Sequence, residues 1–157
     1  MPSLWRISNY SSLSGDGGLH FSARWHTAGR PIVYFAESPA GAMVEALVHL
    51  EFDEQDWPRS YQLLQAEYPE KLHMETLNPG ATRDWRTSVA VTRKLGDAWL
   101  RSGRSALVRV PSVILPETWN VLLNPDHEDA RQVRVVRTVR ADYDPRLIRA
   151  PRRPRHS

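Results

Sequence analysis

The spacing of apolar and polar positions along this chain is most informative between residues 31 and 50. Residues 31–36 (PIVYFA) are mostly β-branched or aromatic, which is typical of a buried strand. Ser38 and Pro39 then predict a helix start, because serine caps a first turn and proline lacks only an N–H that would be unsatisfied there. Residues 40–50 are apolar nearly all round, so we expect this helix to be buried on several sides.

Glu45 is the one carboxylate inside that apolar helix. Its neighbour one turn later is His49, and no lysine or arginine stands three or four positions away. An unpaired carboxylate is costly to bury, so we expect Glu45 to face a cleft or a cation from another part of the fold. The alternative is an ordinary glutamate on a thin exposed edge of the helix.

The rest of the pattern predicts further strands and a second long helix. Residues 19–25 alternate moderately and are expected to pair with residues 32–36 through a turn at 27–30. Thr87 or Ser88 precedes a helix that ends at Gly103. Further strands are predicted at residues 4–7, 61–68, 106–110, 120–125 and, as an edge strand, 132–139. This order indicates an α+β fold with a mixed or antiparallel sheet and a few helices.

Composition narrows the class of protein. A chain of 157 residues can form one domain with a substantial core. Cysteine is absent, which excludes disulfides and thiolate catalysis, and the six histidines form no H-x-x-x-H pair, so no metal site is expected. The N-terminus is too polar for a signal peptide and no apolar run approaches a membrane span. We therefore predict a cytoplasmic protein that does not enter a membrane.

The basic pI of about 9.6 is a property of the C-terminus. Residues 146–157 hold five of the 21 basic residues and no acidic one, which leaves 16 basic against 18 acidic residues elsewhere. We therefore predict one domain over residues 1–145 and a basic, disordered tail over residues 146–157. Such a tail can contact nucleic acid or an acidic partner, or it can be a solvated terminus.

Three motifs in a fixed order resemble the RES domain family, which is named for an arginine, a glutamate and a serine. They are WRI at 5–7, ARWHTAGRPIVYFAESPAGAMVEALVH at 23–49 and VPSVILPETWNVLLNPDH at 110–127. The resemblance extends from Trp5 to about Arg146. It implies a fold related to ADP-ribosyltransferases and a toxin paired with an Xre-type antitoxin protein. The implied activity is consumption of NAD⁺ by hydrolysis, by phosphorolysis or by ADP-ribosyl transfer to a protein.

The resemblance also implies a set of functional residues. On this chain they are Arg24, Tyr34, Glu45 and Ser112, with Arg6 as a further contact. Where many members have Gly-Arg-Trp-Asn, this chain has Ala23-Arg24-Trp25-His26. The local loop geometry and the contact of the usual asparagine are therefore open questions here.

The chemistry of NAD⁺ cleavage is consistent with these residue types. Nicotinamide leaves as a neutral base, so positive charge rises on the ribose and one carboxylate, Glu45, can stabilise it. Arginine forks suit a pyrophosphate. Tyr34 can stack on the nicotinamide or hydrogen-bond to it, and Ser112 can orient the amide or the ribose.

Each assignment has a structural alternative. Tyr34 could be a core residue, Ser112 a turn residue, and Arg24 a surface partner of Asp16 or Glu37. The alternative functions are a ribonuclease, which the same residue types and basic tail would also suit, and a non-enzymatic module that binds nucleic acid. The sequence leaves the oligomeric state open, a homodimer included.

Overall fold

A computed structural model describes residues 1–49, 58–80 and 84–147 of the chain. The strands are β1 (Ser3–Ile7), β2 (Val33–Ala36), β3 (Ser60–Glu67), β4 (Met74–Thr76), β5 (Leu107–Pro111), β6 (Trp119–Leu123) and β7 (Arg134–Asp142). The helices are α1 (Gly17–His20), α2 (Pro39–His49) and α3 (Val89–Ser102), with two 3₁₀ turns, η1 (Glu128–Gln132) and η2 (Pro145–Leu147). The predicted α+β class is confirmed.

All seven strands form one mixed sheet in the order β4-β5-β6-β2-β1-β3-β7. Only β4 and β5 are parallel, and every other neighbouring pair is antiparallel. The register of β1 and β2 has one paired position, Trp5 with Ala36, whereas β1 and β3 pair over five. The two halves of the sheet are therefore only loosely joined between β1 and β2.

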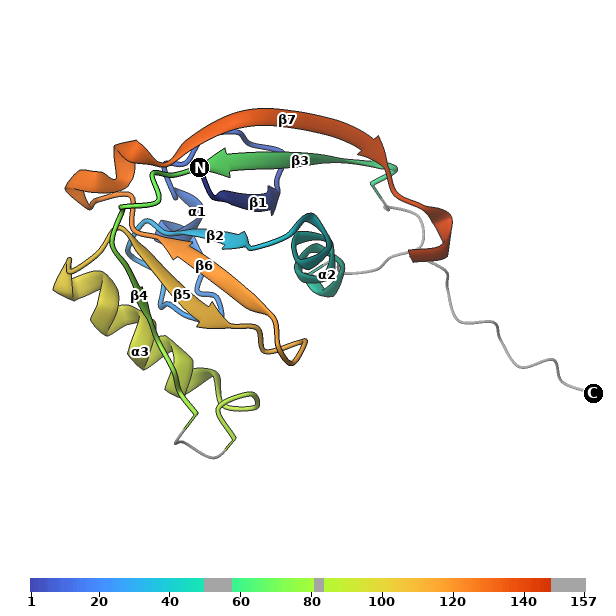
Figure 1. Ribbon diagram of the computed structural model, residues 1–157. Coiled ribbons are helices and arrows are strands. Elements are labelled where there is room, and N and C mark those ends of the chain that lie inside the picture. The colour runs from blue at the N-terminus through green and yellow to red at the C-terminus, as the bar shows by residue number, and fades with distance from the viewer. Residues whose placement is uncertain (50–57, 81–83, 148–157) are drawn as a thin grey trace, which may run out of the picture.

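Figure 1 shows how the two halves are arranged. The strands β1, β3 and β7 arch over the half formed by β2, β6, β5 and β4, and α3 covers the outer face of that lower half. One apolar core joins both halves and includes Leu4, Phe35, Leu107 and Leu123. A second core lies under α3 and includes Trp25, Trp99 and Leu122. The helix α2 follows β2 and lies at the open end between the halves.

The second long helix and the edge strand agree with the sequence pattern. α3 runs for 14 residues and ends at Gly103, whose φ of 61° places it in the left-handed region that glycine favours. Ser88 precedes the helix, although its side chain makes no capping hydrogen bond. β7 lies at one edge of the sheet, as predicted. The other edge, β4, was not predicted, because three residues are too few to show a period.

The predicted hairpin between residues 19–25 and 32–36 is wrong. Leu19 and His20 lie in α1, and residues 21–25 form no strand beyond one isolated bridge between Ala23 and His26. Both edges of β2 are occupied by other strands, β1 and β6. Pairing with these distant strands replaced the local hairpin, because it buries both faces of β2 in apolar cores.

The expectation that α2 is buried on several sides is also wrong. Ser38 does cap the helix, since its Oγ accepts a hydrogen bond from the Gly41 N–H at 2.9 Å. Within the described part of the helix, however, only Gly41 and Ala42 are buried, and Val48 is 58% exposed. Leu50 and most of the acidic connector that follows lie outside the described residues. No helix in the described ranges is long and apolar enough to cross a membrane.

Candidate active site

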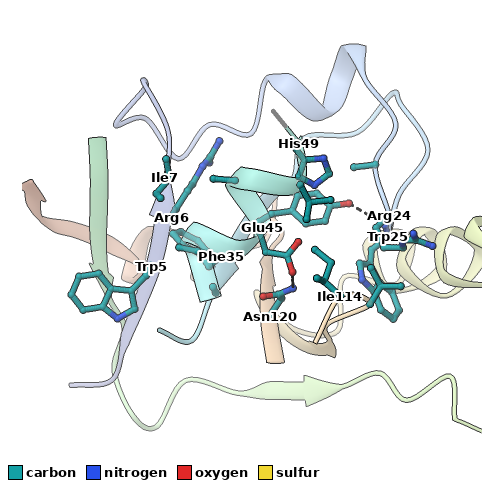
Figure 2. Close-up of a pocket in the computed structure, with 17 residues that line it drawn as sticks. Trp5, Arg6, Ile7, Arg24, Trp25, Phe35, Glu45, His49, Ile114 and Asn120 are labelled. Atoms are coloured by element: carbon teal, nitrogen blue, oxygen red, sulfur yellow. Dashed lines mark hydrogen bonds between the residues drawn. The ribbon is translucent and has the colours of Figure 1, made fainter. Parts of the chain in front are cut away.

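A cavity of about 380 Å³ lies where β1, β2 and α2 meet. Its size is within the range of small-molecule sites in proteins. Most of its lining is apolar, but Arg6, Arg24, Glu45, His49 and Asn120 add polar groups. In Figure 2, Glu45 lies between Arg6 on one side and Arg24 with Trp25 on the other. The cavity thus gathers residues from segments that lie far apart in the chain.

The carboxylate of Glu45 is held by one of its two oxygens. Ser112 Oγ donates to Oε1 at 3.2 Å, and Asn120 Nδ2 donates to the same oxygen at 2.9 Å. Oε2 accepts no hydrogen bond from the described residues. It is also not among the buried polar atoms that lack a partner, so this oxygen is not enclosed by protein. The second oxygen is therefore free to interact with a ligand. The expectation that Glu45 faces a cleft is correct.

Ser112 lies behind Glu45 and not in the cavity lining. It is 2% exposed, and its Oγ accepts hydrogen bonds from the N–H groups of Ile114 at 3.1 Å and Leu115 at 3.2 Å. With both acceptor sites used, its single proton is directed to Glu45. This arrangement favours a role for Ser112 in orienting the carboxylate over the direct substrate contact that the resemblance implies.

We predict that Ser112→Ala destabilises the protein by about 1–3 kcal/mol, because two backbone N–H groups lose their acceptor. The NAD⁺ turnover that the resemblance implies should fall less than tenfold, since Asn120 still holds Glu45 through the shorter of its two hydrogen bonds. Urea unfolding and turnover on one preparation would measure both effects. Ser11→Ala, which removes the hydroxyl of an exposed serine in the loop after β1, is the control. Unchanged stability together with complete loss of turnover would show that Ser112 acts on the substrate directly.

Arg6 contributes an unusual cation to the cavity. It extends from β1 on the opposite side of the strand from Trp5, and it is half-buried (Figure 2). Burial lowers the pKa of its guanidinium, although arginine still stays charged at neutral pH. No described residue gives Arg6 a hydrogen bond or an ion pair. A partly desolvated cation without a partner is a strong indication of an anionic ligand.

Arg24 is placed by the packing of its loop on α3. Thr92 Oγ1 donates to the Arg24 carbonyl, and Arg93 Nε donates to the Ala23 carbonyl at 2.8 Å. A Cβ on Gly96 would lie 1.7 Å from the Trp25 carbonyl oxygen, so only glycine permits this approach. The Arg24 side chain donates to the Arg86 carbonyl at 3.4 Å. Among the described residues it has no carboxylate partner, and Glu37 pairs with Arg109 instead.

Tyr34 presents its ring to the cavity while its hydroxyl is bound by the loop. The hydroxyl accepts from the Trp25 N–H at 3.2 Å and lies 2.7 Å from His26 Nδ1. His26 Nε2 lies 3.2 Å from the Gly18 carbonyl, which can only accept, so Nε2 carries the proton and Tyr34 donates to Nδ1. Burial raises the pKa of Tyr34. The geometry therefore favours stacking by the Tyr34 ring over hydrogen bonding to a ligand.

His26 answers the question that its replacement of asparagine raised. The ring is 2% exposed and links the Gly18 carbonyl to the Tyr34 hydroxyl, so it is a structural part of the loop. The motif marked position 26 as unusual, but its partners lie eight residues away on either side. Only the folded loop could identify them.

We predict that the free energy of unfolding decreases as the pH is lowered below 6.5. Burial lowers the His26 pKa from 6.5, so the folded protein keeps this ring neutral while the unfolded chain takes up a proton. The unfolded state then binds more protons, and the free energy of unfolding should fall by up to about 1.4 kcal/mol per pH unit from this group. Urea unfolding between pH 7 and 5 measures the free energy of unfolding at each pH. The slope of this free energy against pH should be shallower for His26→Gln than for the wild type. The exposed His20→Gln is the control, and equal slopes for all three proteins would contradict the prediction.

Sequence reasoning did not single out Asn120. It begins the apolar part of β6 and was interpreted only as part of a strand. A polar amide at the start of an apolar run was the available signal, but its partner Glu45 is 75 residues away. No group of three histidine or acidic residues in the described ranges is arranged to hold a metal ion.

Comparison with known proteins identifies the family. The RES domain model matches residues 3–144. The chain belongs to the RES domain family. A Toxin Res of Pseudomonas putida is 47% identical over 132 residues, which cover 84% of this chain and 90% of that protein. A Prs ADP-ribosylating toxin of a Sphingobium species is 37% identical over 158 residues, covering 94% and 97% of the two chains.

The fold of this RES domain also matches a solved structure. A chain in the crystal structure of the M. tuberculosis MbcT-MbcA toxin-antitoxin complex superposes with a TM-score of 0.68 over 92% of this chain and 85% of that chain. The sequence identity is 18%, so this likeness concerns the fold alone. In the RES domain described here, four of the five predicted site residues line one cavity, and Ser112 supports it from behind.

Proposed function

We propose that this protein is the toxin of a toxin–antitoxin pair and that it consumes NAD⁺ in the cavity beside Glu45. The observation that carries the proposal is a pair of free groups of opposite charge: the Arg6 guanidinium without a partner among the described residues and the unoccupied Oε2 of Glu45. A pyrophosphate suits the cation, and a ribose that becomes positive suits the carboxylate. The relatives named as Res toxins and as an ADP-ribosylating toxin support the same assignment.

The proposed chemistry breaks the bond between the ribose C1′ and the nicotinamide nitrogen. The bonding electron pair goes to the nitrogen, so nicotinamide leaves as a neutral base and no general acid is needed. Positive charge develops on the ribose, and Glu45 stabilises it through the free oxygen. The acceptor oxygen then bonds to C1′ and loses its proton. Arg6 and Arg24 hold the pyrophosphate, and the Tyr34 ring stacks on the nicotinamide.

The acceptor is water, phosphate or a protein side chain, and one experiment distinguishes the three. Purified protein is incubated with NAD⁺ in buffer, with inorganic phosphate, or with proteins of a cell lysate, and the products are identified by mass. Free ADP-ribose indicates hydrolysis, its phosphate ester indicates phosphorolysis, and modified protein indicates ADP-ribosyl transfer. The relative named as a Prs ADP-ribosylating toxin makes the third arm essential. Unchanged NAD⁺ in all three arms would overturn the proposed function.

We also propose that an antitoxin protein of the Xre type blocks this cavity. A solved structure of similar fold comes from a toxin-antitoxin complex, and the family resemblance implies the Xre type. Arg6 and Arg24 would accept carboxylates or the C-terminal carboxylate of such a partner, because both lack carboxylate partners among the described residues. The toxin and the antitoxin would meet in the cytoplasm.

The basic tail is expected to be peripheral to this activity. Among the described residues, those that line the cavity lie between Trp5 and Asn120, and Arg146 pairs with Asp144 at 2.8 Å within its own turn. Truncation after Ala150 should therefore leave the melting temperature unchanged. The rate of NAD⁺ turnover should stay within about twofold of that of the full chain. Thermal unfolding and turnover measure the two effects, with the full chain as the control. A folded truncated protein without turnover would place the tail in the active site.

A further inference from the structure

Asn120 occupies a position that its own hydrogen bonding does not explain. It lies in β6, where it pairs with Ala36 of β2 on one side and with Val110 of β5 on the other. The central place of β6 in the sheet fixes its backbone. Its Nδ2 donates to Glu45, but its Oδ1 is a buried side-chain atom without any hydrogen-bond partner in the described structure. A buried acceptor without a donor is unfavourable for stability.

Exchanging the positions of Oδ1 and Nδ2 by turning the Asn120 amide over would not improve its hydrogen bonding. A carboxylate only accepts hydrogen bonds, so the turned amide would place Oδ1 against Glu45 Oε1 and lose the one favourable contact. The hydrogen bond to Glu45 therefore dictates the orientation of the amide. Asn120 serves the carboxylate at the cost of its own oxygen, a pattern that functional sites often show.

We propose that Asn120 is a positioning residue that selects which oxygen of Glu45 faces the substrate. Asn120 and Ser112 come from neighbouring strand ends and donate to the same oxygen, Oε1. Two donors on one oxygen fix the carboxylate plane and leave Oε2 directed away from them. Because residues 43–47 of α2 are only half-buried, the helix packing alone does not hold this side chain. This inference rests on the proposed function, since it assigns the role to the carboxylate that stabilises the ribose.

The test compares two substitutions that differ in shape and in hydrogen bonding. Asn120→Asp keeps the shape of asparagine but replaces the donor by a group that repels Glu45. Asn120→Ala removes both the shape and the donor. A positioning role predicts that kcat for NAD⁺ falls about 10- to 100-fold in Asn120→Ala and at least as far in Asn120→Asp. KM should stay within about threefold in both, because Arg6 and Arg24 still bind the pyrophosphate.

A role in packing alone predicts the opposite order. Asn120→Asp would then resemble the wild type. Asn120→Ala would have a lower melting temperature and a nearly normal kcat. That order would overturn the inference. Thermal unfolding of both variants separates folding from catalysis, and Asn124→Ala, which alters a buried asparagine beyond the end of the same strand, is the control for stability.

The inference and the proposed function fail in different ways. Wild-type protein that leaves NAD⁺ intact contradicts the function. If the wild type cleaves NAD⁺, but Asn120→Asp resembles it and Asn120→Ala loses only stability, the result contradicts only the role of Asn120. Growth arrest on expression in cells provides a second readout that does not assume the substrate. Both variants should arrest growth less than the wild type at equal protein levels, and Asn120→Asp should be no more toxic than Asn120→Ala. Full toxicity of Asn120→Asp would overturn the inference whatever the substrate is.

Discussion

Glu45→Gln is expected to lower single-turnover NAD⁺ cleavage by about 10²–10³, equivalent to roughly 3–4 kcal/mol of transition-state stabilisation. Glutamine has nearly the same shape, and its amide oxygen can accept the hydrogen bonds that Ser112 and Asn120 now give to Oε1. The helix α2 should therefore stay in place, with unchanged or slightly higher stability. What disappears is the negative charge opposite the ribose, so the loss should appear in turnover more than in NAD⁺ affinity.

Thermal unfolding, NAD⁺ binding and single-turnover cleavage measured on one preparation test this expectation. Glu70→Gln removes an exposed carboxylate outside the cavity lining and serves as the control. A folded Glu45→Gln protein that cleaves NAD⁺ within about threefold of the wild-type rate, a difference under 1 kcal/mol, would contradict the catalytic role.

Arg6→Met is expected to weaken NAD⁺ binding by about 100-fold, since a bidentate hydrogen bond to a charged group contributes roughly 3 kcal/mol. Methionine replaces the apolar stem and removes the partly desolvated charge, so the melting temperature should stay the same or rise. Arg6→Lys keeps the charge but not the planar fork, and it should lie between the wild type and Arg6→Met in affinity.

Calorimetric titration in the Glu45→Gln background measures these affinities without consuming the ligand. Arg140→Met removes an exposed positive charge of β7 and controls for the change in net charge. If Arg6→Met and Arg140→Met bind NAD⁺ equally well, Arg6 does not hold the pyrophosphate, and another anion must explain its free guanidinium.

Local features of the sequence were sufficient for the elements that carry most of the site. The β-branched run of β2 and the Ser38-Pro39 start of α2 are local signals, and the structure has both elements where these signals lie. The isolation of Glu45 was readable for the same reason, because potential partners along a helix stand at known spacings. The family motifs then named a residue set that the fold brings around one cavity, with Ser112 just behind it.

Pairing between distant segments decided what the sequence could not show. The expected hairpin before β2 gave way to pairing with β1 and β6, and β6 lies more than eighty residues later in the chain. The incomplete burial of α2 had the same origin, since only the sheet decides how much of a helix it covers. A sequence pattern reports which residues are apolar, but not how many neighbours the fold supplies to bury them.

The sequence by itself determined the class of fold, the helix that carries Glu45 and the family to which the chain belongs. The tertiary structure alone decided that Oε1 is held while Oε2 is free, that Arg6 has no partner among the described residues, and that Tyr34 gives its hydroxyl to His26. The physical reason is the range of the interactions. Helix propensity and capping act over a few neighbouring residues, whereas the hydrogen bonds to Glu45 join residues 67 and 75 positions apart and exist only after the sheet has formed.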